Sequence, residues 1–390
     1  MKKVLAIVLA MMLVLSAAGM AESLKIGVFE PASGDNGAGG KQEVLGIEYA
    51  HSLAPTVEIN GTVYDVELDI VDNQSQTDKA VSAAQTLVND KVSIVLGSYG
   101  SGVSMAGGDV FAANEIPAIG CSCTNPSVTL LCDYYWRVCF LDPFQGTVMA
   151  NFAREEKQAK KAYVLTQVGD DYSTGLGFYF QQAFEGMGGE VVAETFTEGT
   201  SDFTAYLNNA MNSGCDFMFA PSSTTSASLI INQAASMNVP FAVTAGDTWE
   251  SSVILDAAKG KNVEVYCSTF FDEKDESSTA AAEFVSGFKG WLNANADKKT
   301  NNGGNDIVAA VSALGFDAYN VALEAIKAAG SPDPQAIALA LPFVTYDGVT
   351  GSISFDENGA ANKDMAYIKK ANNETGEFDF VKTQSVAELG

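Results

Sequence analysis

Short apolar runs alternate with helical patterns along most of this chain. In the first part, the strand-like runs lie at residues 24–29, 64–71, 92–97 and 116–120, and helical patterns lie around 44–50 and at 78–89 and 102–113. Strands that alternate with helices build parallel sheets whose two faces are covered by those helices. The pattern therefore predicts an α/β fold.

A second series of the same kind follows a long break at residues 135–160. Its strands are expected at 162–166, 190–194, 217–220 and 241–244, and its helices at 175–187, 203–212 and 226–237. A third region adds helices at 280–294 and 307–329 and short strands at 351–355 and 366–370. Two such series in 390 residues, 47% of them apolar, indicate two lobes rather than one core.

The first residues have the pattern of a secretory signal. Lys2 and Lys3 precede an apolar run at residues 4–15, which is too short to span a bilayer, and small residues follow up to Ala21. We predict a signal peptide at residues 1–21 that is cleaved after Ala21; a retained membrane anchor is the alternative. No Cys stands at the predicted cut to carry a lipid, so we expect a free periplasmic or extracellular protein.

Charge and missing motifs exclude several classes of function. The chain has 22 basic and 48 acidic residues, a net charge of -26, which argues against binding to nucleic acid or to anionic membrane surfaces. His51 is the only histidine, and the sequence has no nucleophile elbow, zinc-protease motif or phosphate-binding loop. We therefore expect no enzymatic activity, no cofactor and no metal.

The six cysteines leave three alternatives open. Four of them fall within 19 residues, with spacings that are not among the common zinc patterns. A zinc site, a local disulfide and buried free thiols all remain compatible with the sequence. The cysteines are Cys121, Cys123, Cys132, Cys139, Cys215 and Cys267.

Two loops of the first series are suited to binding a carboxylate. Residues 97–102 (GSYGSG) and 121–126 (CSCTNP) each connect a predicted strand to a predicted helix. Helix starts present unpaired backbone N–H groups and a partial positive charge, and Ser101 and Thr124 add hydroxyl donors. Simple capping of the two helices is the alternative interpretation.

Two loops of the second series could hold the rest of an amino-acid-like ligand. Asp247 follows a predicted strand and would supply the negative charge that an ammonium group needs. Tyr172 and Trp249 could cover the apolar part of a ligand. The alternative is that Asp247 is a turn residue and Trp249 a packing residue. The hydroxyl-rich segment 222–225 could bind ligand or cap the next helix.

Several segments together resemble the periplasmic-binding-protein type I fold, in its branched-chain amino-acid-binding family of transporter components. The segments are Ile26-Gly27-Val28, Asp72 with the helix at 78–89, Val95-Leu96-Gly97 with Ser101, Thr124-Asn125-Pro126-Ser127, Asp171 to Gly175, and Gly246-Asp247. The resemblance covers nearly all of the chain after the signal peptide. It implies two doubly wound Rossmann-like lobes, joined by three crossovers, that close around a ligand.

The resemblance also implies lobe boundaries and partners. We expect one lobe at residues 22–142 plus 270–347 and the other at 143–269 plus 348–390, with crossovers near 141–146, 267–271 and 346–351. Such a protein would be monomeric and would deliver its ligand to the membrane permease of an ABC transporter. A ligand-binding sensor component is the rival class.

Individual site residues follow from the same resemblance. Ser101, Ser122 and Thr124 would hold the ligand's α-carboxylate, Tyr172 would close over it from the other lobe, and Asp247 would pair with the α-amino group.

This sequence departs from the family pattern at two places. Ser223 stands where an aromatic residue is usual, and Gly39 and Gly40 stand where a larger side chain often lines the pocket. Both changes predict more room or more polarity near the ligand side chain. Aromatic, polar and amide-type ligands, and non-amino-acid solutes such as urea, therefore remain options beside leucine, isoleucine and valine.

Overall fold

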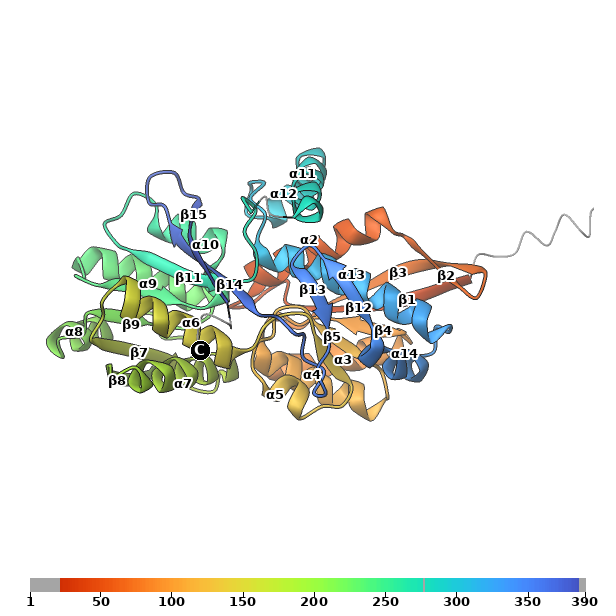
Figure 1. The fold of residues 1–390 in the computed structure, drawn as a ribbon, viewed down its shortest axis with the longest axis horizontal. Helices are drawn as coiled ribbons and strands as arrows, with labels where there is room; N and C mark the ends of the chain where they lie inside the picture. Colours follow the sequence, from red (N-terminus) through yellow and green to blue (C-terminus); the bar gives the residue numbers. More distant parts are fainter. Residues whose placement is uncertain (1–21, 276–277, 386–390) are drawn as a thin grey trace, which may run out of the picture.

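The computed structural model describes residues 22–275 and 278–385. The predicted signal peptide lies outside the described residues. Figure 1 shows two α/β bodies side by side, each built around its own sheet. This arrangement confirms the predicted α/β fold.

The first sheet has six strands in the order β2-β3-β1-β4-β5-β6. All neighbours are parallel except β2, which is antiparallel to β3. The strands are β1 (Glu22–Glu30), β2 (Thr56–Ile59), β3 (Thr62–Asp72), β4 (Ile94–Leu96), β5 (Ala118–Gly120) and β6 (Tyr135–Arg137).

Helices cover both faces of this sheet because its central strands are apolar on both sides. Val28 and Ile94 pack in one core with α2 and α13, whereas Phe29 and Val95 pack in another core with α3 and α4. Alternate residues of a strand point to opposite faces, which explains the division. The helices are α2 (Gly37–Leu53), α3 (Thr77–Asn89), α4 (Ser101–Ala113), α5 (Ser127–Leu130) and α13 (Ala310–Ala329).

The second sheet has seven strands in the order β15-β14-β11-β10-β9-β7-β8. The strands from β8 to β11 are parallel, and β14 and β15 add an antiparallel edge. The strands are β7 (Lys161–Gln167), β8 (Glu190–Phe196), β9 (Phe217–Phe219), β10 (Ala242–Ala245), β11 (Val265–Thr269), β14 (Met365–Ala371) and β15 (Phe378–Ser385).

The same alternation divides the core of the second body. Val164 of β7 faces the core that contains α6 and α7, and Leu165 faces the core of α8 to α10. The helices are α6 (Asp142–Asn151), η1 (Phe152–Glu156), α7 (Asp171–Gly186), α8 (Thr204–Asn212), α9 (Thr224–Met237), η2 (Asp247–Trp249) and α10 (Ser252–Ala258).

The third region is shared between the two bodies. Its helices are α11 (Thr279–Ala294), α12 (Ala296–Asn301), α14 (Pro334–Ala340) and η3 (Leu341–Phe343), and the hairpin β12 (Thr345–Gly348) to β13 (Gly351–Ser354) follows them. Asp317 of α13 accepts hydrogen bonds from the backbone N–H groups of Val349 and Thr350, both at 2.9 Å. This anchors the hairpin to the first body. The segment after it stays there, because Gly359 and Ala361 hydrogen-bond to Arg137 of β6. The chain enters the second sheet with β14, at Met365, whereas the sequence placed this crossing near residues 346–351.

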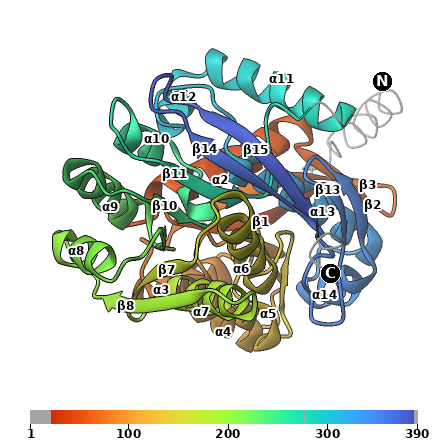
Figure 2. The ribbon, with the colours of Figure 1, turned by 60° about the vertical axis from the view of Figure 1, so that its left-hand side comes forward.

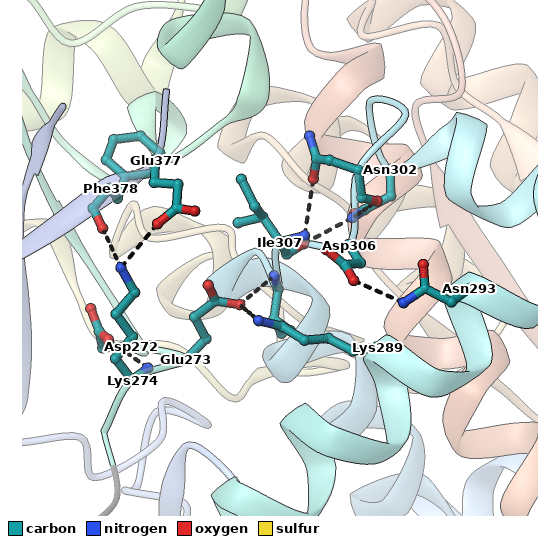
Figure 3. Close-up of polar contacts among 12 residues, drawn as sticks. Asp272, Glu273, Lys274, Lys289, Asn293, Asn302, Asp306, Ile307, Glu377 and Phe378 are labelled. Carbon is teal, nitrogen blue, oxygen red and sulfur yellow. Dashed lines mark hydrogen bonds and ion pairs between the residues drawn. The ribbon is translucent and has the colours of Figure 1, made fainter. Parts of the chain in front are cut away.

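Polar contacts tie the second crossing, which follows β11, to both bodies (Figure 3). Glu273 Oε2 accepts a hydrogen bond from the backbone N–H of Val308 at 2.9 Å and pairs with Lys289 of α11, also at 2.9 Å. Lys274 pairs with Glu377, beside β15, at 3.3 Å. Figure 2 shows α11 and α12 above β14 and β15 at this junction.

Two features of the sequence are resolved by the fold. All six cysteines are buried and unpaired, so the free-thiol alternative holds.

The break predicted at residues 135–160 contains β6, α6 and η1. β6 has only three residues and α6 has no clear apolar stripe, so periodicity could not show them. Among the described residues, no helix has the length and apolarity that crossing a membrane requires.

Candidate functional site

Both sheets reverse their strand order at one point. In the first sheet β1 lies between β3 and β4, and in the second β7 lies between β8 and β9. Doubly wound sheets open a crevice at such points, beyond the carboxyl ends of the strands. A cavity of about 360 Å³ lies between the two crevices and is lined by loops that follow strands of both sheets.

Five of the seven residues singled out from the sequence line this cavity. They come from loops and helix starts that are up to 146 positions apart in the chain, and each has an exposed fraction of 5% or less. The five residues are Ser101, Ser122, Tyr172, Ser223 and Asp247.

Thr124 and Trp249 are not among the lining residues. Thr124 is fully buried beside the Asp142 carboxyl, and burial raises the pKa of that carboxyl to about 8. Trp249 is fully buried in the apolar core of the second body, together with Val243 and Ile254. The Trp249 ring is buried because it packs into that core, and it does not cover the cavity.

The start of α4 forms one wall of the cavity. Gly100 has φ +110°, a conformation that favours glycine, and turns the chain into the helix at Ser101. The backbone N–H groups of the first helical turn have no partner within the helix, and residues 100–103 line the cavity. Ser101 Oγ accepts a hydrogen bond from the Asn125 backbone N–H at 3.2 Å. This wall offers an anion a partial positive charge.

Asp247 lies opposite, in the second body, and has only neutral partners. Gln145 Nε2 donates to its Oδ1 at 2.8 Å, and the Tyr172 hydroxyl donates to the same atom at 3.1 Å. Burial raises the pKa of Asp247 to about 7, and these hydrogen bonds oppose that effect. The carboxyl is thus poised to ionise when a cation approaches.

Two buried glutamates lie behind the cavity, and sequence reasoning missed both. Glu30 Oε2 accepts a hydrogen bond from the Tyr99 backbone N–H at 2.7 Å, and Glu43 Oε2 accepts one from Ser122 Oγ at 2.5 Å. The Oε1 atom of each carboxyl has no hydrogen-bond partner among the described residues. The pair therefore positions two residues that line the cavity.

Cys121 completes this cluster, the one group in the described part of the chain with three close metal-ligand side chains. The ligand atoms of Glu30, Glu43 and Cys121 lie within 4.8 Å of one another. Burial raises the pKa of both carboxyls and of the Cys121 thiol, and a protonated thiol is a poor metal ligand. The cluster is better suited to sharing a proton between its carboxyls than to holding a metal.

Tyr99 occupies the space that Gly39 was expected to leave open. A Cβ atom added at Gly39 would lie 2.5 Å from the Tyr99 ring. The Tyr99 hydroxyl reaches across to the second body and donates to the Thr248 carbonyl at 3.4 Å. The expected extra room is thus filled by an aromatic side chain from the next loop, a residue inside the GSYGSG segment.

Further hydrogen bonds connect the two bodies around the cavity. Thr224 Oγ1 donates to the carbonyl of Asp35 at 2.9 Å, and Asn125 Nδ2 donates to the carbonyl of Asp171 at 2.8 Å. The structure therefore has the two bodies in contact on the rim of the cavity.

Comparisons with known proteins agree with this geometry. The periplasmic binding protein family model matches residues 23–375. The leucine-binding protein LivK from Thermotoga maritima MSB8 has a similar structure, with a TM-score of 0.83 and 32% identity over 94% of this chain and 99% of that one. The transporter substrate-binding protein LivJ from Streptococcus pneumoniae, in complex with isoleucine, has a TM-score of 0.81 and 28% identity over 94% and 99%.

A relative known from its sequence extends the comparison. The Leu/Ile/Val-binding protein homolog 1 of Brucella abortus (strain 2308) is 29% identical over 86% of each chain. The family match covers most of the described residues, and the two-sheet topology and the cavity agree with it. The chain belongs to the periplasmic binding protein family.

Proposed function

We propose that this chain is the substrate-binding component of an ABC transporter and that it binds an amino acid in the cavity between its two lobes. The observation that carries the proposal is the pairing of opposite chemistry across the cavity. The start of α4 with Ser101 offers an anion site on one lobe, and the buried carboxyl of Asp247 offers a cation site on the other. The similarity to leucine-binding and isoleucine-bound proteins supports this reading.

The residues have distinct roles in this proposal. The first-turn N–H groups of α4, with the Ser101 hydroxyl and the Ser122 backbone N–H, hold the α-carboxylate, and Asp247 pairs with the α-ammonium group. Tyr172 closes over the ligand, and Ser223 contributes a hydroxyl. Hydrogen bonds to charged groups contribute about 1.5–3 kcal/mol each, so these contacts suffice to favour the closed form when a ligand bridges both lobes.

The two lobes are proposed as the units that move. They comprise residues 22–142 with 270–363 and residues 143–269 with 364–385. The third boundary lies before β14, because Gly359 and Ala361 hydrogen-bond to Arg137 of the first sheet. The protein acts as an exported monomer without enzymatic activity and hands its ligand to a membrane permease.

A thermal-shift screen tests the proposal. The chain without its predicted signal peptide is unfolded, dialysed and refolded to remove carried ligand, and then screened against the twenty amino acids, urea, short amides, sugars and small carboxylates. A ligand that binds only the folded state adds about 2.7 kcal/mol at a hundred times its Kd, which shifts Tm clearly. Shifts with amino acids are expected; shifts only with compounds that lack an α-amino group would overturn the role of Asp247.

A further inference from the structure

The cavity is far more acidic than an aliphatic ligand requires. Six of its 21 lining residues are Asp or Glu and none is Lys, Arg or His, whereas the whole chain has 48 acidic and 22 basic residues among 390. Val103 is the one aliphatic side chain larger than alanine among the lining residues. A leucine side chain would gain little apolar contact here, because burial in apolar surroundings is what stabilises it.

Carboxylates from both lobes line the cavity, and no basic side chain lines it with them. Asp35 follows β1, and Asp170 and Asp171 follow β7, and all three line the cavity. The pKa of Asp170 is raised by its burial and further by the negative charges of Asp171 and Asp35. Among the described residues, no hydrogen bond or ion pair reaches the side chain of Asp35 or Asp171. The nearby Lys79 instead pairs with Asp78 at the rim, at 3.2 Å.

Two neutral side chains of the cavity also present acceptors rather than donors to a ligand. The hydroxyls of Ser122 and Tyr172 donate to the carboxyls of Glu43 and Asp247, which leaves their lone pairs for a ligand. Both donors to Asp247 reach its Oδ1, and no described residue donates to its Oδ2. The rings of Tyr99 and Tyr172 add surfaces that attract cations.

We propose that the cavity selects an amino acid with a positively charged side chain, and that Asp35 and Asp171, from opposite lobes, bind that charge. The inference rests on the proposed function, because it names the side-chain class of the ligand at the same site. Lobe closure brings the two carboxylates together, and a ligand cation between them removes their mutual repulsion. A neutral aliphatic ligand leaves that repulsion in place.

The affinities of different amino acids test the ligand class directly. Refolded wild-type protein is titrated calorimetrically with L-lysine, L-arginine, L-glutamine, L-leucine and L-glutamate at low and high salt. Lysine or arginine is expected to bind at least about tenfold more tightly than glutamine or leucine, a difference of one decade in Kd. The preference for lysine and arginine should become smaller at high salt, because salt screens the carboxylates of Asp35 and Asp171. Glutamate should not bind.

Two variants and a matched control locate the effect. D35N and D171N should each lower the preference for lysine over glutamine by about tenfold. D256N removes one exposed carboxylate from α10, outside the cavity, and should leave the preference unchanged. Circular dichroism spectra that match the wild type establish that each variant is folded.

The outcomes separate the two proposals. Binding of leucine, isoleucine or valine with an affinity equal to or above that of lysine overturns the cationic ligand class and leaves the transporter function intact. Equal loss of preference in D256N overturns the role of Asp35 and Asp171. Binding of no amino acid at all overturns both this inference and the proposed function.

Discussion

At the scale of single residues, the cavity depends on carboxyl groups whose charge is controlled by burial. Asp247 is 2% exposed and is contacted by Gln145 and Tyr172, both neutral. Glu30 and Glu43 are buried side by side and have no basic partner among the described residues. Each of these groups binds a proton more readily than it would in water. Ligand affinity and stability should therefore both depend on pH.

Affinity for an amino acid should fall as the pH drops below 7. The pKa of Asp247 is raised to about 7, and the ligand's ammonium group requires the ionised carboxylate. Each pH unit below 7 should raise Kd by up to about tenfold, because one pKa unit corresponds to about 1.36 kcal/mol. Calorimetric titration between pH 5 and 8 measures this. D247N should bind weakly at every pH; a pH dependence that persists in D247N would place the titrating group elsewhere.

The free energy of unfolding should decrease with rising pH over the range in which Glu30 and Glu43 are protonated in the folded state but ionised in the unfolded state. Their pKa values are raised from 4.5, first by burial. Their contribution is thus complete below about pH 4.5 and is lost as the pH rises towards the folded-state values. Gln at position 43 cannot ionise and can donate to Glu30. Urea unfolding at pH 5 and 8 should show the E43Q variant gaining stability relative to the wild type at the higher pH; parallel curves would contradict the assignment.

At the scale of elements, close helix packing supports the first lobe behind the cavity. α13 lies along α2, and two glycines allow the approach. A Cβ atom at Gly46 would overlap the Ser312 carbonyl, and one at Gly315 would overlap the Glu43 carbonyl. Larger residues at these two positions would therefore push α2, which carries Glu43, away from α13.

Replacing Gly46 by Ala should destabilise the protein despite the better helix propensity of alanine. Overpacking of a close contact costs about 1–3 kcal/mol. The matched control is Gly290 in α11, where a Cβ atom would meet nothing within 4 Å. G290A should be neutral or stabilising by up to about 1 kcal/mol, since Gly is the poorer helix former. Urea unfolding compares the two variants; equal stability would show that the helices can separate without cost.

At the scale of the whole molecule, a buried ion cluster joins the two lobes near the ligand site. Lys369 of β14 lies 2.8 Å from Glu250 and 3.4 Å from Asp272, and all three side chains are 5% exposed or less. Glu250 Oε2 also accepts a hydrogen bond from the Ala310 backbone N–H, at the start of α13, at 2.7 Å. Glu250 follows Asp247 by three residues, so the ligand site and the junction between lobes share one segment.

Removing the positive charge of Lys369 should be strongly destabilising. K369M leaves Glu250 and Asp272 buried without a cation, which costs about 3–5 kcal/mol. The neighbouring Lys370 is more exposed and pairs with Glu264 at 3.3 Å, so K370M should cost only about 0–1 kcal/mol. Chemical denaturation of both variants measures the difference. Similar losses in the two would indicate that the cluster is better hydrated than its burial suggests.

Local patterns in the sequence were enough to predict the α/β alternation, because strand and helix signals depend on residues that are near one another in the chain. Boundaries shifted where a cap decided them: α7 begins at Asp171 rather than near residue 175, because the Asp170 side chain accepts hydrogen bonds from the Tyr172 and Ser173 N–H groups. The loops around Ser101 and Asp247 were also found this way, since both follow clear strands.

Only the tertiary structure decided which side chains face the cavity. Trp249 and Asp247 are two residues apart, yet the ring packs into the core and the carboxyl lines the cavity. Tyr99 fills the space beside Gly39, although the two are separated by 60 positions. Glu30 and Glu43 become neighbours because a strand and the helix after it converge behind Ser122. Side-chain direction and burial depend on packing between distant segments, which a local pattern does not contain.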